Sequence, residues 1–266
     1  MIEALQFTFM QHALVAAVIV SLIAGIVGSL VVINRMVFLT GGIAHASYGG
    51  IGLALYFSFP IVLGASLFAV ATSLLLAYLT LHHRRKLDTH IGLIWAVGMA
   101  IGIVFTDMTQ GYHVDLLGYL FGSILAVDRQ DLIIAGILLA VIASIVTLRY
   151  RQLLAVSYDS EFAMLSGIDT PRCYTLLLLM ASLSVVAAIK VVGLILVIAL
   201  FTVPVHIAEK VTTTLWQMMA VASLLALLFS IAGLYLAYRF DLTSGATIIL
   251  VAAAGMLLSA LLPSKR

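Results

Sequence analysis

One histidine, His45, lies in a stretch of small residues, GGIAHASYGG at 41–50, in a chain that is otherwise mostly apolar. Imidazole is the commonest metal-ligating side chain and also transfers protons. Helical spacing places Gly41, Gly49 and Gly52 on the same stripe as this ring. The pattern therefore favours a histidine that faces a cavity with room for a small solute or a hydrated ion. The structural alternative is a ring that only hydrogen-bonds a neighbouring helix.

Two other pairs combine metal-ligating side chains at short spacing. They are His113 with Asp115, in the polar stretch 107–115, and His206 with Glu209. The second pair has a spacing of three residues, which places both side chains on one face of a helix. Imidazole suits zinc, iron(II) and manganese, whereas carboxylate oxygen favours the harder manganese. The pairs therefore permit metal binding without selecting a metal. His113 and Asp115 would lie on the outer side, whereas His206 and Glu209 have an alternative interpretation as a satisfied interfacial pair.

The composition places these residues in a membrane. Of the 266 residues, 64% are hydrophobic and 9% are charged, and the mean hydropathy is +1.24. A soluble domain needs more polar surface than this. The apolar runs can cross about 30 Å of hydrocarbon as helices, and they do not alternate as the strands of a membrane barrel would. We predict an all-α polytopic bundle of about eight to nine transmembrane helices, in one domain over 1–266, with candidate spans at 11–33, 41–58, 61–82, 89–106, 131–149, 172–190, 193–208, 215–237 and 244–262.

Charge and cysteine content exclude other classes of protein. A net charge of +2 gives no electrostatic footprint for a nucleic acid partner. The single cysteine, Cys173, allows neither an internal disulfide nor a thiolate metal cluster. The phosphate-binding pattern G-x-x-x-x-G-K-[ST] is absent from the sequence. We therefore expect no covalent cofactor and no enzymatic activity in this chain, so that any ATP would be hydrolysed on another polypeptide.

The distribution of Lys and Arg predicts the orientation, because basic residues are enriched in cytoplasmic loops. If the loop at 82–86 is cytoplasmic, the nine spans leave only Arg129, Lys190 and Arg239 outside among the 13 basic residues. This predicts an N-terminus outside and a C-terminus inside. The segment 116–128 is too short to span upright, and we expect an interfacial or re-entrant helix there.

Small residues form stripes on the first two predicted spans. In lipid, close helix packing relies on small residues, because burying one apolar surface against another gains little. On the second span the stripes predict a compact core around that helix. The residues expected to pack in this way are Gly42, Ala46, Gly49, Gly50 and Gly52.

The cytoplasmic segment 157–168, SYDSEFAMLSGI, predicts a short separate helix. Asp159 is a suitable N-cap, Glu161 suits the positive end of the helix dipole, and Gly167 is a natural stop. Such a helix either lies on the membrane or docks a soluble partner. The residues expected to form it and its apolar patch are Asp159, Ser160, Glu161, Phe162, Ala163, Leu165 and Gly167.

Several motifs in order along the chain resemble the permease subunit of the bacterial ABC transporters for zinc, manganese and iron(II). They are Asn34-Arg35-Met36, Ala44-His45-Ala46-Ser47, Leu87-Asp88, Gly92-Leu93-Ile94, Ala96 to Ala100, Val114-Asp115-Leu116, Tyr119 to Leu125, Asp159 to Gly167, and Val192-Gly193 with the apolar run to Pro204. The motifs cover most of the chain.

The resemblance implies a BtuC-like import permease in the bacterial inner membrane. It implies a homodimer with the metal pathway along its two-fold axis, a separate ATPase, and an extracytoplasmic metal-binding protein. Residues 158–167 would be the coupling helix that sits in the ATPase. His45 matches the histidine of the family's Asp-x-x-x-His pair, but Gly41 stands at the aspartate position, so half of that pair is missing.

Two other functions remain open from the sequence. A secondary transporter driven by protons or sodium would need no ATPase, but it commonly has paired broken helices in two related halves, and no such repeat is visible here. A membrane scaffold that transports nothing would leave His45 and its glycine surroundings without a role.

Overall fold

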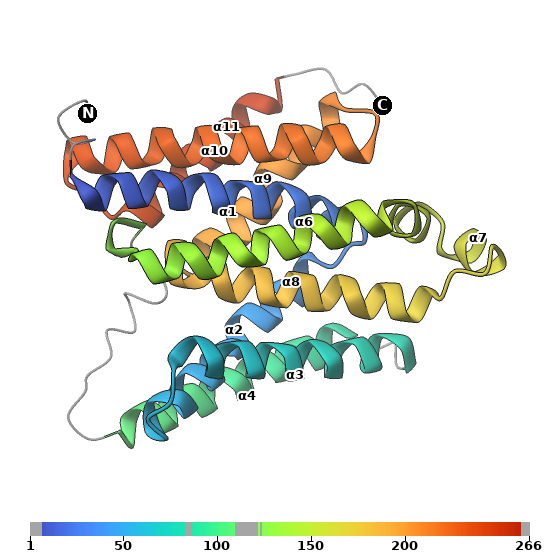
Figure 1. Ribbon diagram of the computed structural model, residues 1–266, viewed down its shortest axis with the longest axis horizontal. Coiled ribbons are helices and arrows are strands. Elements are labelled where there is room, and N and C mark those ends of the chain that lie inside the picture. The colour runs from blue at the N-terminus through green and yellow to red at the C-terminus, as the bar shows by residue number, and fades with distance from the viewer. Residues whose placement is uncertain (1–6, 83–86, 110–121, 123, 262–266) are drawn as a thin grey trace. The chain divides into compact units, whose positions relative to one another are not determined.

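The described residues of the chain are helical. The structure is a computed structural model that describes residues 7–82, 87–109, 122 and 124–261, and no strand occurs in these ranges. The helices, in chain order and as labelled in Figure 1, are α1 (Thr8–Ile33), α2 (Val37–Tyr56), α3 (Ile61–His82), α4 (Leu87–Asp107), the 3-10 turn η3 (Ile124–Ala126), α6 (Arg129–Tyr158), α7 (Ser160–Leu165), α8 (Thr170–Val192), α9 (Leu194–Val211), α10 (Leu215–Phe240) and α11 (Ser244–Ser259).

Each of the nine predicted spans corresponds to one helix, so the all-α polytopic class is confirmed. Among the described residues, seven helices are long and apolar enough to cross a membrane, and α11 is a shorter apolar helix of 16 residues. The 20-residue helix α2 is not among the seven, because Gly, Ser and His lower the hydropathy along it. Most of α2 is buried in protein, so it needs little apolar surface towards lipid. Of the helix expected at 116–128, only the turn η3 lies in a described segment.

The contacts divide the chain into two compact units. The first unit consists of Met1–Ile33, Leu117–Leu148 and Ala187–Arg266, and the second of Asn34–Leu116 and Arg149–Val186. Both α6 and α8 contribute to each unit. In α6 the change of unit coincides with a kink, since Arg149 has φ −109° and ψ 15°. The expectation of one permease domain over 1–266 stays a prediction.

In the first unit, α1 packs against α9 and α10, and α11 packs against the same two helices (Figure 1). Glycine allows the close approach of α1: a Cβ atom added to Gly28 would lie 2.7 Å from the backbone oxygen of Phe201. In addition, Val205 of α9 and Met218 of α10 belong to a buried apolar cluster against which Ile33 packs. The unit is therefore held together by small-residue contacts and by interdigitated apolar side chains.

In the second unit, α2 packs against both α3 and α4 (Figure 1). On the α4 side, a Cβ atom added to Gly98 would lie 2.6 Å from Cα of Ala46, and one added to Gly52 would collide with the backbone of Gly102. On the α3 side, a Cβ atom at Gly50 would collide with the backbone of Gly64. The backbones of these helices are therefore in direct contact, as the small residues of α2 require.

These contacts predict that Gly98→Val destabilises the second unit, whereas Gly92→Val does not. A side chain at 98 would force α4 away from Ala46, and overpacking of this kind costs about 1–3 kcal/mol. Gly92 lies on the same helix, but a Cβ atom there would have no neighbour within 4 Å. Thermal unfolding of the purified variants in detergent measures the difference. Equal midpoints for the two variants would contradict the packing described.

Candidate functional site

Most buried hydroxyl groups of the helices are satisfied within their own helix. Thr40 Oγ1 donates to Met36 O at 2.9 Å, and Thr106 Oγ1 donates to Gly102 O at 2.8 Å. This matters in a membrane, where no water is present to bind an unpaired polar group. Two buried polar atoms differ from these hydroxyl groups. Ser21 Oγ and the ring nitrogen His45 Nδ1 have no hydrogen-bond partner in the described part of the chain.

His45 lies in the middle of α2, and its ring stacks on Trp95 of α4. The ring centroids are 4.0 Å apart and the ring planes differ by 12°. The indole is itself fixed, since Trp95 Nε1 approaches Met99 Sδ at 3.1 Å. One face of the imidazole is therefore covered by the indole, while Nδ1 has no protein partner among the described residues. A buried ring nitrogen without a partner is costly, and a ligand on it would remove that cost.

The glycines near His45 do not leave the open space that the sequence suggested. A Cβ atom at Gly49 would lie 2.8 Å from the backbone oxygen of Gly98, and one at Gly52 would collide with Gly102. The interpretation of these glycines as the walls of a cavity is therefore wrong, because the backbone of α4 fills the space. Their physical role is to let α4 come close enough for its indole to reach the ring.

The site supplies one imidazole and no carboxylate from its own helix. Gly41 is buried at the position one turn before His45. No group of three or more His, Cys, Asp or Glu side chains that could hold a metal ion occurs in the described residues. Within one chain the arrangement therefore suits a contact that binds a metal ion briefly, and not a structural site that retains one.

The other predicted metal ligands are not assembled with His45. His113 and Asp115 lie outside the described residues. His206 is exposed and Glu209 is partly buried on α9, in the first unit, whereas His45 belongs to the second. Next to Glu209, Lys210 Nζ lies 3.4 Å from both oxygens of Ser259 on α11. The roles of all four residues in metal binding stay predictions.

The short helix α7 has well-defined ends. Asp159 accepts a hydrogen bond from the amide of Phe162 at 2.8 Å, which caps the N-terminus. At the C-terminus, Gly167 has φ 82° and its amide donates to Met164 O, while the amide of Ile168 donates to Ala163 O. This pair of bonds is the Schellman motif, which glycine favours because its backbone accepts a positive φ. The helix is therefore fixed at both ends although it contains only six residues.

The side chains of α7 divide into an inner and an outer set. Ala163 is fully buried against Val156 and Cys173, which anchors the helix to the second unit. The exposed fractions of the outer side chains are 62% for Phe162, 60% for Met164 and 85% for Leu165. Ser160, Glu161 and Gly167 are exposed as well. The helix thus presents an apolar surface of three large side chains, defined here as the α7 patch: Phe162, Met164 and Leu165.

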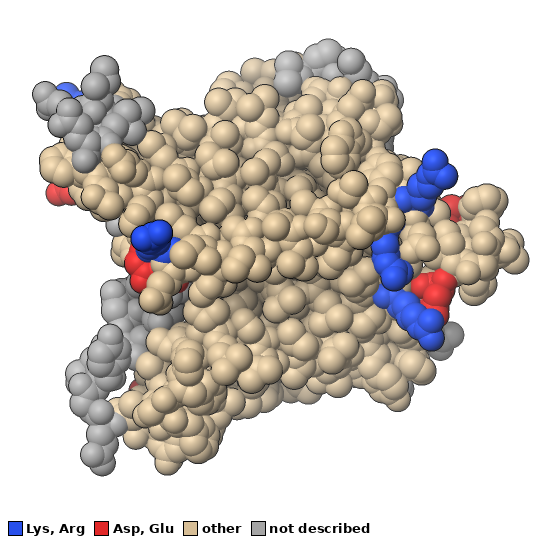
Figure 2. All heavy atoms as spheres, in the orientation of Figure 1, with Lys and Arg blue, Asp and Glu red and all other residues tan. Residues whose placement is uncertain are grey.

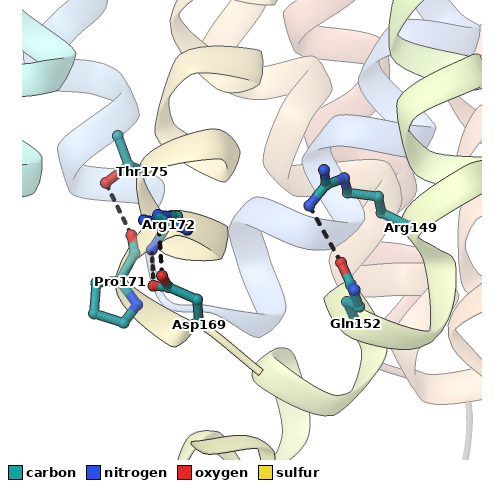
Figure 3. Close-up of polar contacts among 6 residues, drawn as sticks. All are labelled: Arg149, Gln152, Asp169, Pro171, Arg172 and Thr175. Atoms are coloured by element: carbon teal, nitrogen blue, oxygen red, sulfur yellow. Dashed lines mark hydrogen bonds and ion pairs between the residues drawn. The ribbon is translucent and has the colours of Figure 1, made fainter. Parts of the chain in front are cut away.

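Basic side chains flank the α7 patch. Figure 2 shows Lys and Arg, with acidic residues among them, gathered beside α7. Arg149 donates to Gln152 Oε1 at 3.4 Å, and Arg172 pairs with Asp169, with Nε and Oδ2 3.0 Å apart (Figure 3). Asp169 also accepts from the amide of Arg172 and so caps α8. An apolar patch with a basic border is suited to a groove in another protein.

Comparison with known proteins decides the family. Residues 6–263 match the ABC 3 transport family. The chain belongs to the ABC 3 transport family. It is 46% identical over 259 residues to an uncharacterised membrane protein of Synechocystis sp., covering 97% of this chain and 92% of that protein. It is 36% identical over 251 residues to the manganese transport system membrane protein MntC of Halalkalibacterium halodurans, with 94% and 86% covered.

A solved structure agrees with this assignment to the ABC 3 transport family. PsaBC from Streptococcus pneumoniae in complex with a Fab matches with a TM-score of 0.89 and 30% identity, over 98% of this chain and 94% of that one. The resemblance to the metal ABC permeases, the BtuC-like fold class and the location in the bacterial inner membrane are therefore confirmed. The roles of individual residues are not tested by these similarities.

Sequence reasoning missed two residues of the site. Trp95 is one of two tryptophans in the chain, and it follows Gly92-Leu93-Ile94, one of the motifs that carried the resemblance. It lies one turn after Ile91 and one turn before Gly98, so helical spacing alone places it on the face of α4 that packs against α2. Met164 was also missed, since the periodicity of a six-residue helix does not show which side is exposed.

The capping bond predicts that Asp159→Ala loosens α7, whereas Ser160→Ala does not. Loss of an N-cap costs about 1 kcal/mol, which corresponds to roughly fivefold faster exchange of the capped amide of Phe162. Hydrogen exchange followed by mass spectrometry over 158–168 measures this. Unchanged exchange in Asp159→Ala would show that the cap does not hold the helix.

Proposed function

We propose that the chain is the transmembrane permease of an ATP-driven importer of a divalent transition metal, with manganese as the first candidate. The observation that carries the proposal is the position of His45: a stacked, partly buried imidazole with an unpaired Nδ1 in the middle of a membrane helix. The choice of metal is supported by the relatives, one of which is named a manganese transport system membrane protein. Zinc and iron(II) are the alternatives that imidazole chemistry allows.

The ligand set favours passage of the metal over its retention. One imidazole per chain, without the carboxylate that Gly41 replaces, leaves most positions around the ion to water or to other groups. Manganese prefers oxygen ligands, so a single nitrogen binds it weakly. Weak binding is what a pathway needs, because an ion that binds tightly is released slowly. In the proposed homodimer the two-fold axis would bring a second imidazole to the same pathway.

The α7 patch is the proposed contact with the ATPase. Three large apolar side chains at least 60% exposed are an unfavourable surface for water, and they gain stability when a partner covers them. The buried Ala163 and the two caps keep the helix in place, so that a movement of the partner is transmitted to α6 and α8. ATP would be hydrolysed on that partner, and an extracytoplasmic protein would deliver the metal from the other side.

We expect His45→Ala to reduce metal uptake at limiting manganese by about tenfold, while the variant still assembles. Loss of the His45 imidazole from each chain is worth at least the roughly 1.4 kcal/mol to which a tenfold change corresponds. The matched control is His82→Ala, because His82 is exposed at the end of α3 and its ring contacts only Tyr78 among the described residues. Uptake by the reconstituted complex and size-exclusion chromatography give the two readouts. If both variants transport equally well, His45 is not in the pathway.

We expect Phe162→Asp to abolish co-purification of the ATPase, because a charge in the centre of the α7 patch would be buried without a partner. Phe57→Asp is the control: Phe57 is 63% exposed, nearly the same as Phe162, but it follows α2 at the opposite side of the membrane in the predicted topology. The measurement is the ratio of the two subunits after affinity purification. Retention of the ATPase by Phe162→Asp would remove α7 as the docking element.

A further inference from the structure

We propose that a groove between α1 and α10 binds one acyl chain of a phospholipid. The groove has a volume of about 430 Å³, and both of its walls are membrane-spanning helices that pack side by side (Figure 1). Its lining includes Val18, Leu22 and Ile26 from α1, and Ala220, Leu224 and Leu227 from α10. It lies in the first unit, whereas His45 and the α7 patch lie in the second.

The floor of the groove is a contact between the two backbones. A Cβ atom added to Gly25 would collide with Ser223, so at this point α1 and α10 touch and the larger side chains on either side form the walls. The hydroxyl of Ser223 donates to Met219 O at 2.8 Å and offers no hydrogen to a ligand. Ser21 Oγ is the one polar group of the lining for which the described residues provide no partner. A polar ligand would lose its hydration here with almost nothing in exchange, so the occupant is hydrocarbon.

The length of the groove corresponds to one leaflet. On α10 the lining runs from Trp216 to Leu227, which at 1.5 Å per residue is about 16 Å, close to half of the ~30 Å hydrocarbon core. Spread over that length, the volume gives a mean cross-section of about 27 Å². The groove therefore accepts an extended acyl chain over the depth of one leaflet.

The end of the groove at Trp216 fits the position of a lipid headgroup. α10 begins at Leu215, and Thr214 caps it by accepting from the amide of Gln217. Trp216 is thus in the first turn of the helix, is 59% exposed, and lies where tryptophan is enriched in membrane proteins, at the boundary between hydrocarbon and water. A phospholipid with its headgroup near Trp216 would place its chain along the groove towards Leu227.

The test compares Ala220→Phe with Ala232→Phe in the full-length purified protein. Both alanines are exposed on α10, but only Ala220 lines the groove. Native mass spectrometry after stepwise removal of phosphatidylcholine measures the lipid that stays bound to each chain. We expect one phospholipid per chain to resist removal in the parent and in Ala232→Phe, and Ala220→Phe to retain at least fivefold less. Equal retention in the two variants would overturn the proposal, and so would loss of a dimer, without loss of lipid, in Ala220→Phe.

A second measurement does not depend on filling the groove. In a W95F background Trp216 is the sole tryptophan, so its fluorescence reports the contents of the groove. In detergent, with one equivalent of phosphatidylcholine that carries brominated acyl chains, a bound chain would quench Trp216 by at least twofold. The same quenching should disappear when excess unbrominated lipid is added. No quenching at one equivalent would mean that the groove does not bind an acyl chain.

Discussion

The direct contact between the backbones of α2 and α4 is the constraint on which the site depends. It exists because Gly52 faces Gly102 and Ala46 faces Gly98, so that no side chain separates the two helices. With any larger residue there, α4 would move outwards and its indole would leave the imidazole of His45. The small residues of α2 therefore act on the site indirectly: they position the aromatic side chain that orients the ring.

The same contact explains why α2 carries many small residues in place of large apolar ones. Helices that face lipid need large apolar side chains, whereas a helix surrounded by protein needs small ones for close packing. Glycine, alanine and serine meet that need along α2, and the buried residues of this helix include Gly42, Gly49 and Gly50. One imidazole can be tolerated in such a helix because its ring lies against protein and not against lipid.

Much of the fold was predictable from the sequence, because its signals are local. Apolar runs of sufficient length predicted nine helices in the right order. Asp159 predicted the start of α7 as a side-chain cap, and Gly167 predicted its end as a residue that accepts a positive φ. Both signals act within a few residues. The surroundings of His45 were predicted less well. Glycines one turn away could equally have bordered a cavity or a second backbone, and only the tertiary contacts with α4 distinguish the two. The exposure of Met164 and the burial of Ala163 also depend on contacts distant in sequence.

In the proposed function, this chain conducts a divalent metal at the expense of ATP hydrolysed by a partner. The most direct measurement is accumulation of manganese in proteoliposomes that contain the chain with its ATPase, supplied with the metal-binding protein outside and ATP inside. We expect accumulation that requires ATP and stops when the ATPase is omitted. Equal accumulation without the ATPase, driven by a proton or sodium gradient, would contradict it.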